Sequence, residues 1–137
     1  MIGLENFGGI FRLKQLQNVK IVSLPISLII LTDEHWISIY ITDKTVEIMD
    51  SAGFINAVYI PKMLKRFLRV HINNKDLTIT PKLQSDTSSA CALYATTFLY
   101  FRTVTGKSLC EFCKIFTSDK SINCAIIKEL FNEIWKK

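Results

Sequence analysis

The 137-residue sequence is 49% hydrophobic and 21% charged, with a net charge of +5, a composition that excludes a disordered chain. Its length predicts one domain over residues 1–137, and no apolar run is long enough to cross a bilayer. Because no basic stretch precedes an apolar one at the start, we expect no signal peptide and free cysteine thiols in a reducing compartment.

The first third of the chain predicts a loop followed by two short strands. Within residues 1–18, the pair Gly8-Gly9 permits a sharp turn or a close backbone approach, and we interpret it as a plain loop. Two apolar runs follow, residues 19–24 and residues 28–32, on either side of Pro25. We expect both to be buried strands that break at the proline.

A β-hairpin is predicted over residues 36–49. Isoleucines alternate with other side chains from residue 36 to residue 41, which is the period of a strand with two different faces. Thr42 to Thr45 provide a tight turn, and residues 46–49 form the returning strand. Residues 50–53 then end the hairpin.

From Pro61 the apolar period becomes helical, and Pro61 suits the first turn of a helix. Four basic residues lie between the apolar ones: Lys62, Lys65, Arg66 and Arg69. This basic face indicates either a contact with DNA phosphates or an ordinary solvated helix surface, and the sequence leaves both open. Residues 77–80 then predict a strand that Pro81 closes.

Two further helices are predicted in the last third of the chain. One begins at Cys91, after a polar loop that offers Ser88 or Ser89 as N-cap, and ends near Gly106. It is apolar on nearly all sides, so we expect it to run through the middle of the fold. The second is amphipathic and carries its apolar residues at positions 126, 127, 130, 131 and 134.

Cys91 is the candidate nucleophile. A cysteine in the first turn of a helix lies where unpaired backbone N–H groups and the helix dipole favour thiolate over thiol. The same N–H groups can hold a developing oxyanion, and the side-chain amide of Gln84 can assist them. The alternative is that Cys91 is one more small buried residue.

The candidate base is His35, because the chain has two histidines and His71 ends a basic helix next to a turn. His35 opens the first strand of the predicted hairpin, and Asp50 ends the second. Antiparallel pairing should therefore place the two side by side at one edge of the sheet, where the acid would orient the imidazole. Taken singly, Asp50 could instead cap a turn and His35 could be a satisfied edge residue.

These residues resemble the motifs of the adenovirus-type maturation proteases, cysteine endopeptidases also found in virophages and Polinton-like elements. The resemblance rests on His35-Trp36, on Met49 to Phe54, and on Gln84 seven residues before Cys91. The segment from Phe7 to Phe11 also resembles a glycine-containing segment near the start of those enzymes. The resemblance as a whole covers roughly residues 5 to 105.

The resemblance implies an α+β fold, with a central, mostly antiparallel sheet packed on helices and the nucleophile at the N-terminus of a buried core helix. It implies that His35 is the general base, Asp50 its orienting acid, Cys91 the nucleophile and Gln84 the oxyanion donor. Gly9 and Trp36 are the expected substrate-binding residues, although Trp36 could equally be a core residue.

Three features depart from the family pattern. Ala92 follows the candidate nucleophile, where those enzymes usually have glycine. No cysteine lies upstream of Cys91, so activation by a peptide through a disulfide, as in the adenovirus enzymes, cannot operate in the same way. The chain is also shorter after the helix that begins at Cys91.

We therefore expect a monomeric endopeptidase, without membrane contact, that cleaves capsid or other structural precursors in the virion and the infected cell. Cleavage after a small residue such as glycine is expected. No cofactor is expected, and the single pair Cys110-x-x-Cys113 is a weak zinc signal, so we expect no metal. Two alternatives remain open: a deconjugating isopeptidase for a SUMO- or ubiquitin-like modifier, and a catalytically silent domain that binds peptide or DNA.

Overall fold

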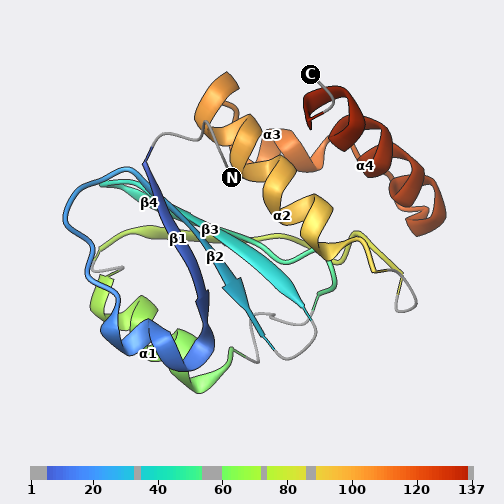
Figure 1. Cartoon of the computed structure of the whole chain (residues 1–137). Helices are drawn as coiled ribbons and strands as arrows, with labels where there is room; N and C mark the ends of the chain where they lie inside the picture. The colour runs from blue at the N-terminus through green and yellow to red at the C-terminus, as the bar shows by residue number, and fades with distance from the viewer. Residues whose placement is uncertain (1–5, 33–34, 54–59, 72–73, 86–88, 136–137) are drawn as a thin grey trace.

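The structure is a computed structural model that describes residues 6–32, 35–53, 60–71, 74–85 and 89–135. Five strands form one sheet in chain order (Figure 1). The strands are β1 (Phe7–Arg12), β2 (Ile26–Leu31), β3 (Trp36–Ile41), β4 (Thr45–Met49) and β5 (Asp76–Ile79). The helical elements are η1 (Leu13–Asn18), α1 (Lys62–His71), α2 (Cys91–Tyr100), η2 (Phe101–Thr105), α3 (Leu109–Cys113) and α4 (Lys120–Trp135).

The predicted hairpin is confirmed as β3 and β4, which pair antiparallel with Ser38 opposite Met49 and Ile41 opposite Val46. Thr42 shapes the turn, because its Oγ1 accepts the backbone N–H groups of Lys44 at 3.1 Å and Thr45 at 2.9 Å. A threonine hydroxyl can replace a backbone acceptor in a tight turn. The local sequence alone therefore specifies this part of the sheet.

The expected α+β class is confirmed, with helices packed on a central sheet. The sheet is mixed rather than mostly antiparallel, because β1 pairs with β2 and β4 with β5 in parallel. All strands except β3 therefore run in one direction. Consequently the C-terminal ends of β1, β2, β4 and β5 meet the start of β3 at the same edge of the sheet.

Two expectations for the start of the chain are wrong. Gly8 and Gly9 lie in strand β1 and not in a loop, at a bulge where the register with β2 shifts. Gly9 has a φ of +127°, a conformation that side chains rarely adopt, and a Cβ on Gly8 would approach Leu28 Cδ2 at 2.6 Å. Residues 19–24 are not a strand: they follow η1 as irregular chain, and Val22 is 95% exposed.

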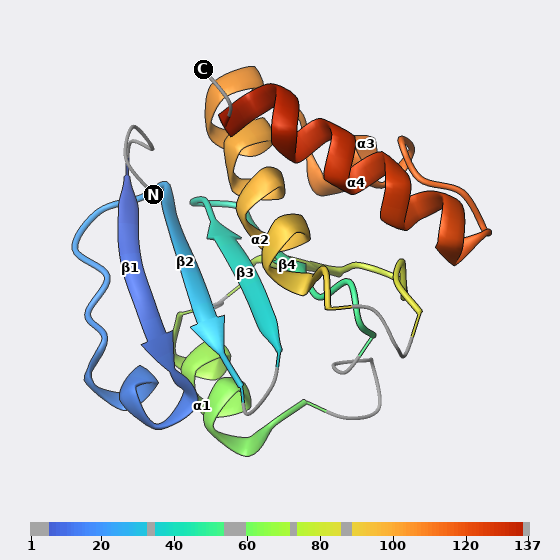
Figure 2. The ribbon, with the colours of Figure 1, turned by 45° about the vertical axis from the view of Figure 1, so that its right-hand side comes forward.

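The sheet separates two apolar layers, as the alternation within β3 predicts. Ile37, Ile39 and Ile41 pack on the side of α1 and η1, whereas Trp36 and Tyr40 belong to the layer beneath α2. Figures 1 and 2 show α1 on one side of the sheet and α2, α3 and α4 on the other. The expectation that the helix beginning at Cys91 runs through the middle of the fold is confirmed, since α2 is largely buried between β3 and α4.

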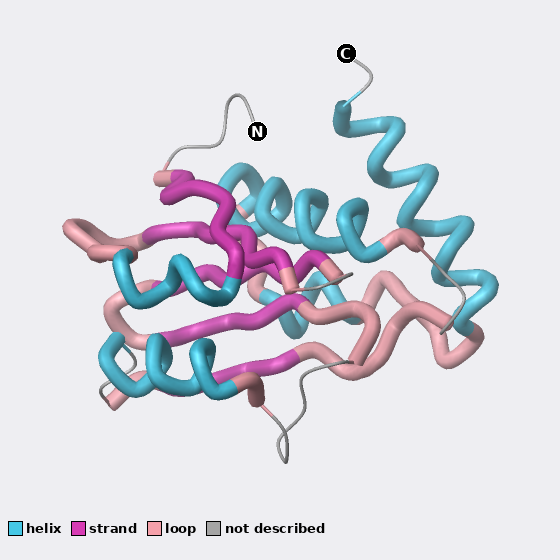
Figure 3. The backbone as a smooth tube through the Cα atoms, turned by 60° about the horizontal axis from the view of Figure 1, so that its bottom comes forward, coloured by secondary structure: helices cyan, strands magenta, loops and turns pink. Residues whose placement is uncertain are grey.

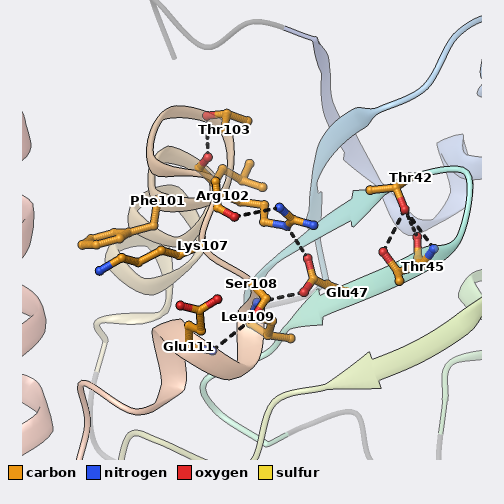
Figure 4. Close-up of polar contacts among 12 residues, drawn as sticks. Thr42, Thr45, Glu47, Phe101, Arg102, Thr103, Lys107, Ser108, Leu109 and Glu111 are labelled. Carbon is orange, nitrogen blue, oxygen red and sulfur yellow. Dashed lines mark hydrogen bonds and ion pairs between the residues drawn. The ribbon is translucent and has the colours of Figure 1, made fainter.

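A partly buried network around Glu47 attaches η2 and the start of α3 to the sheet (Figure 4). Its Oε1 accepts from Nε of Arg102 at 2.7 Å, and its Oε2 accepts from the backbone N–H of Leu109 at 2.8 Å. The Arg102 guanidinium also lies over the Tyr40 ring, 4.6 Å from its centroid. Gly106 then ends η2 with a φ of +75°, the role predicted for it.

The C-terminal helix is also confirmed as α4. Within the described part of the chain, no helix combines the length and the hydropathy that a membrane crossing requires.

Candidate functional site

His35 and Asp50 both lie at the edge of the sheet where β3 begins. His35 directly precedes β3, and its carbonyl oxygen accepts from the Thr32 backbone N–H at 3.0 Å, which closes the connection from β2. Asp50 directly follows β4 and is fully buried, and its backbone N–H donates to Thr80 Oγ1 at 2.7 Å. The structure thus brings these two residues to one end of neighbouring strands, and their catalytic roles stay predictions.

Cys91 reaches the same edge from α2. It is the first residue of the helix and is 7% exposed, and its Sγ accepts the backbone N–H of Trp36 at 3.4 Å. Trp36 is the residue next to His35. The candidate nucleophile therefore contacts the backbone of the strand that the candidate base precedes.

The prediction that Ser89 is the N-cap of this helix is wrong, and the alternative, Ser88, lies outside the described residues. The N-cap is Ala90, which has no side-chain acceptor. Ala90 is buried with 4% exposure, so the close packing at this point selects a small residue over a hydrogen-bonding one. No hydroxyl of the N-cap residue competes for the N–H groups of the first turn.

Gln84 is 1% exposed and forms hydrogen bonds with Ser51, which lies in the loop after β4. The Ser51 hydroxyl donates to Gln84 Oε1 at 2.5 Å, and the Ser51 carbonyl accepts from the Gln84 backbone N–H at 3.1 Å. Because Ser51 holds the oxygen of the amide, the Nε2 end is the one that can donate elsewhere. The loops after β4 and β5 run together at this end of the sheet (Figure 3).

Asn123 of α4 holds the same loop from the other side. Its Nδ2 donates to the carbonyl of Leu83 at 3.0 Å and to that of Thr117 at 2.8 Å, and its Oδ1 accepts the Thr117 backbone N–H at 2.6 Å. Asn123 is fully buried, and a buried amide with its donors and acceptor engaged restrains what it contacts. The segment carrying Gln84 is therefore fixed between Ser51 and Asn123.

Sequence reasoning assigned no role to Ser51 or Asn123. Ser51 stands beside Asp50 in the motif that carries the family resemblance, which is one available signal. For Asn123 the available signal is its position one helical turn before Ile127. A polar amide on the apolar side of a helix indicates a buried hydrogen-bonding role.

The two candidate substrate-binding residues lie in different places. Trp36 is half-buried and packs against the apolar layer beneath α2, next to the backbone contact with Cys91. Gly9 lies in the edge strand β1 and pairs with Leu28 of β2, which pairs with Ile39 of β3. Ile39 is three residues along β3 from Trp36. The structure does not bring Gly9 to the end of the sheet that holds Cys91.

A cleft of about 460 Å³ adjoins the start of α2. Ser89, Ala90 and Leu93 line one wall, and Lys120, Cys124 and Lys128 of α4 line the other. It lies between α2 and α4, beside the residues that precede Cys91. Ala90, which lines this cleft, directly precedes the candidate nucleophile.

The other cysteines occupy different surroundings. Cys110 is exposed, whereas burial, and to a smaller extent Cys110 and Glu47, raise the pKa of Cys113 to about 11. Among the residues that the structure describes, no three His, Cys, Asp or Glu side chains gather in a way that could hold a metal ion.

No protein-family model and no curated protein matches this sequence. Several solved structures match in fold, among them the following two. The ASFV pS273R protease matches with a TM-score of 0.54 and 17% identity, over 77% of this chain and 42% of that protein. The central domain of the uncharacterized Lpg1148 protein from Legionella pneumophila matches with a TM-score of 0.51 and 11% identity, over 96% of this chain and 90% of that domain.

These matches define the class of fold. The chain has an α+β fold with a five-stranded mixed sheet that resembles the fold of the pS273R protease. It spans about two fifths of the length of that protein, and at these identities the likeness is one of fold.

Proposed function

We propose that this protein is a cysteine endopeptidase of viral maturation, with Cys91 as nucleophile, His35 as base, Asp50 as orienting acid and Gln84 as oxyanion donor. The observation that carries the proposal is the 3.4 Å contact between Cys91 Sγ and the Trp36 N–H, directly after His35. The likeness to the fold of the pS273R protease supports the same reading.

The proposed reaction begins when His35 takes the Cys91 proton and the thiolate attacks the scissile carbonyl carbon. The new carbon–sulfur bond leaves an oxyanion, which the Cys91 backbone N–H and Gln84 Nε2 hold. The carbon–nitrogen bond then breaks as the His35 imidazolium returns its proton to the leaving amine. His35 next takes a proton from water, whose oxygen attacks the thioester carbonyl carbon. The carbon–sulfur bond then breaks as the His35 imidazolium gives this proton to the Cys91 sulfur, which releases the acid and restores the thiol.

The proposed substrates are capsid or other viral structural precursors, cleaved after a small residue such as glycine. Part of the substrate would occupy the cleft between α2 and α4, which adjoins Ala90. The protein would act as a monomer within the virion and the infected cell.

The test is to incubate candidate capsid precursors with the protein, with and without DNA, and to sequence the new ends. Cys91→Ala should abolish cleavage and leave the circular dichroism spectrum unchanged, because only the sulfur is removed. Cys110→Ala is the matched control, since Cys110 is exposed and should leave cleavage unchanged.

Cleavage by Cys91→Ala at the parent rate would contradict the proposal. Release of a fluorophore from a SUMO or ubiquitin conjugate, without cleavage of any precursor, would assign the deconjugating activity instead.

A further inference from the structure

A groove lies on the face of the sheet that α1 and η1 cover, opposite α2. It consists of two adjoining cavities of about 350 and 440 Å³ that share the lining residues Ile21, Val70 and His71. One wall is η1 with the irregular chain that follows it, and the other is α1. Figure 3 shows these two short helices as neighbours on the left of the view.

The groove exposes apolar side chains. Val70 on α1 is 68% exposed, and Val22 and Leu24 of the opposite wall are 95% and 40% exposed. All three line the cavities. Large apolar side chains gathered around a hollow indicate a contact surface more than isolated ones do.

The walls of the groove are also uniformly basic. Residues 12–24 and 60–71 contain seven of the 17 lysines and arginines of the chain, and neither segment contains an aspartate or glutamate. Lys20 and Arg66 line the groove itself. The pKa of His71 is lowered by burial and by Lys75, so the positive charge near neutral pH rests on the lysines and arginines.

We propose that this groove docks an acidic, amphipathic segment of a protein partner, with apolar side chains on Val22 and Val70 and carboxylates near Lys20 and Arg66. The complementarity of charge selects an anionic ligand, and the apolar lining selects a polypeptide over a nucleic acid. The sheet separates this groove from Cys91, so docking leaves the candidate active site uncovered. The inference does not depend on the proposed function.

The test begins with selection of a phage library of short random peptides on the whole protein. A labelled consensus peptide is then titrated by fluorescence polarisation. Val70→Asp and Arg66→Glu should each weaken its binding by about 10-fold or more, as expected for central contacts of an interface. Val104→Asp, at an exposed valine of η2, and Lys107→Glu are matched controls that should bind like the parent.

We expect enriched peptides to combine aspartate or glutamate with large apolar residues, and replacement of either kind by serine to abolish binding. Three results would overturn the proposal: no enriched consensus, a consensus peptide that binds the groove variants as tightly as the parent, or full binding after its apolar residues become serine. Binding of short duplex DNA that Arg66→Glu weakens, without peptide binding, would assign the surface to nucleic acid. Circular dichroism of each variant confirms that it is folded.

Discussion

The Trp36 backbone nitrogen and the Cys91 sulfur are 55 residues apart in the sequence and 3.4 Å apart in the structure. An N–H directed at a sulfur stabilises negative charge on it, and the start of α2 adds the positive end of a helix dipole. At the scale of single residues, the proposed site therefore combines a backbone donor and a helix start at the sulfur with a histidine at the adjacent backbone position.

Ser51 orients the side-chain amide of Gln84, because the Ser51 hydroxyl donates to Oε1 at 2.5 Å. We predict that Gln84→Ala lowers kcat by about 10²–10³, the usual effect of losing an oxyanion donor. Ser51→Ala should lower kcat by a smaller factor with little change in KM, because the amide remains but loses its orientation. Steady-state kinetics on a cleaved peptide measures both.

The control for this prediction is Ser51→Thr, which keeps the hydroxyl and should restore most of the lost kcat. If Ser51→Ala raises KM and leaves kcat unchanged, Ser51 contacts substrate or supports the loop only, and the positioning role is wrong.

Cys113 provides a prediction that needs no substrate. Because burial raises its pKa to about 11, Cys113 stays protonated at pH 8, and its thiolate becomes abundant only as the pH approaches 11. Iodoacetamide at pH 8 should therefore modify exposed Cys110 well before Cys113. Peptide mass spectrometry measures this order, with the protein unfolded in urea as control.

Equal labelling of Cys110 and Cys113 in the folded protein would contradict the partial burial of Cys113 against the apolar layer beneath α2.

At the scale of elements, α4 connects the C-terminal part of the chain to the candidate site through Asn123. We predict that Asn123→Ala lowers the free energy of unfolding by about 1–3 kcal/mol, because buried carbonyl groups lose their donor. It should also lower kcat, because the Leu83 carbonyl beside Gln84 is released. Urea unfolding and steady-state kinetics measure the two effects.

Ile127→Ala is the matched control, since it lies one turn further along α4, is fully buried and bonds to no part of the loop. The cavity should cost about 2–5 kcal/mol with kcat retained under folded conditions. A proportional loss of kcat in both variants would mean that Asn123 acts through stability alone.

The elements that could be predicted from the sequence are those whose signal is local. The hairpin follows from the alternation of isoleucines and from the Thr42 turn, and α2 follows from its apolar run between a polar loop and Gly106. Strand β1 escaped prediction because glycines are poor strand formers. The reason for them is tertiary: a Cβ on Gly8 would meet Leu28, and Gly9 has a φ of +127°. Residues 19–24 are apolar enough for a strand, but the edge of the sheet beside β2 is already taken by β1.

The same limit applies to the site. The convergence of His35 and Asp50 on one edge could be predicted, because a short hairpin determines it. The hydrogen bonds from Ser51 to Gln84 and from Asn123 to Leu83 join residues 33 and 40 positions apart. No local pattern encodes such contacts, since they depend on how the loops after β4 and β5 meet α4.

At the scale of the whole molecule, the sheet divides the protein into two faces with different surface chemistry. The α2 face carries Cys91 and the cleft shared with α4, whereas the α1 face carries the basic, apolar groove. Under the two proposals, a partner would bind on one face while a peptide is cleaved on the other.

The most direct test of the account measures the rate at which iodoacetamide modifies Cys91 near pH 6 in the parent and in His35→Gln. An ordinary thiol, with a pKa of about 8.5, is almost wholly protonated at that pH and reacts slowly. We predict that Cys91 in the parent reacts faster than Cys110, and that His35→Gln slows it by about 10-fold or more because the proton acceptor is gone. Equal, slow modification of Cys91 in both proteins would contradict the assignment of a histidine-activated nucleophile.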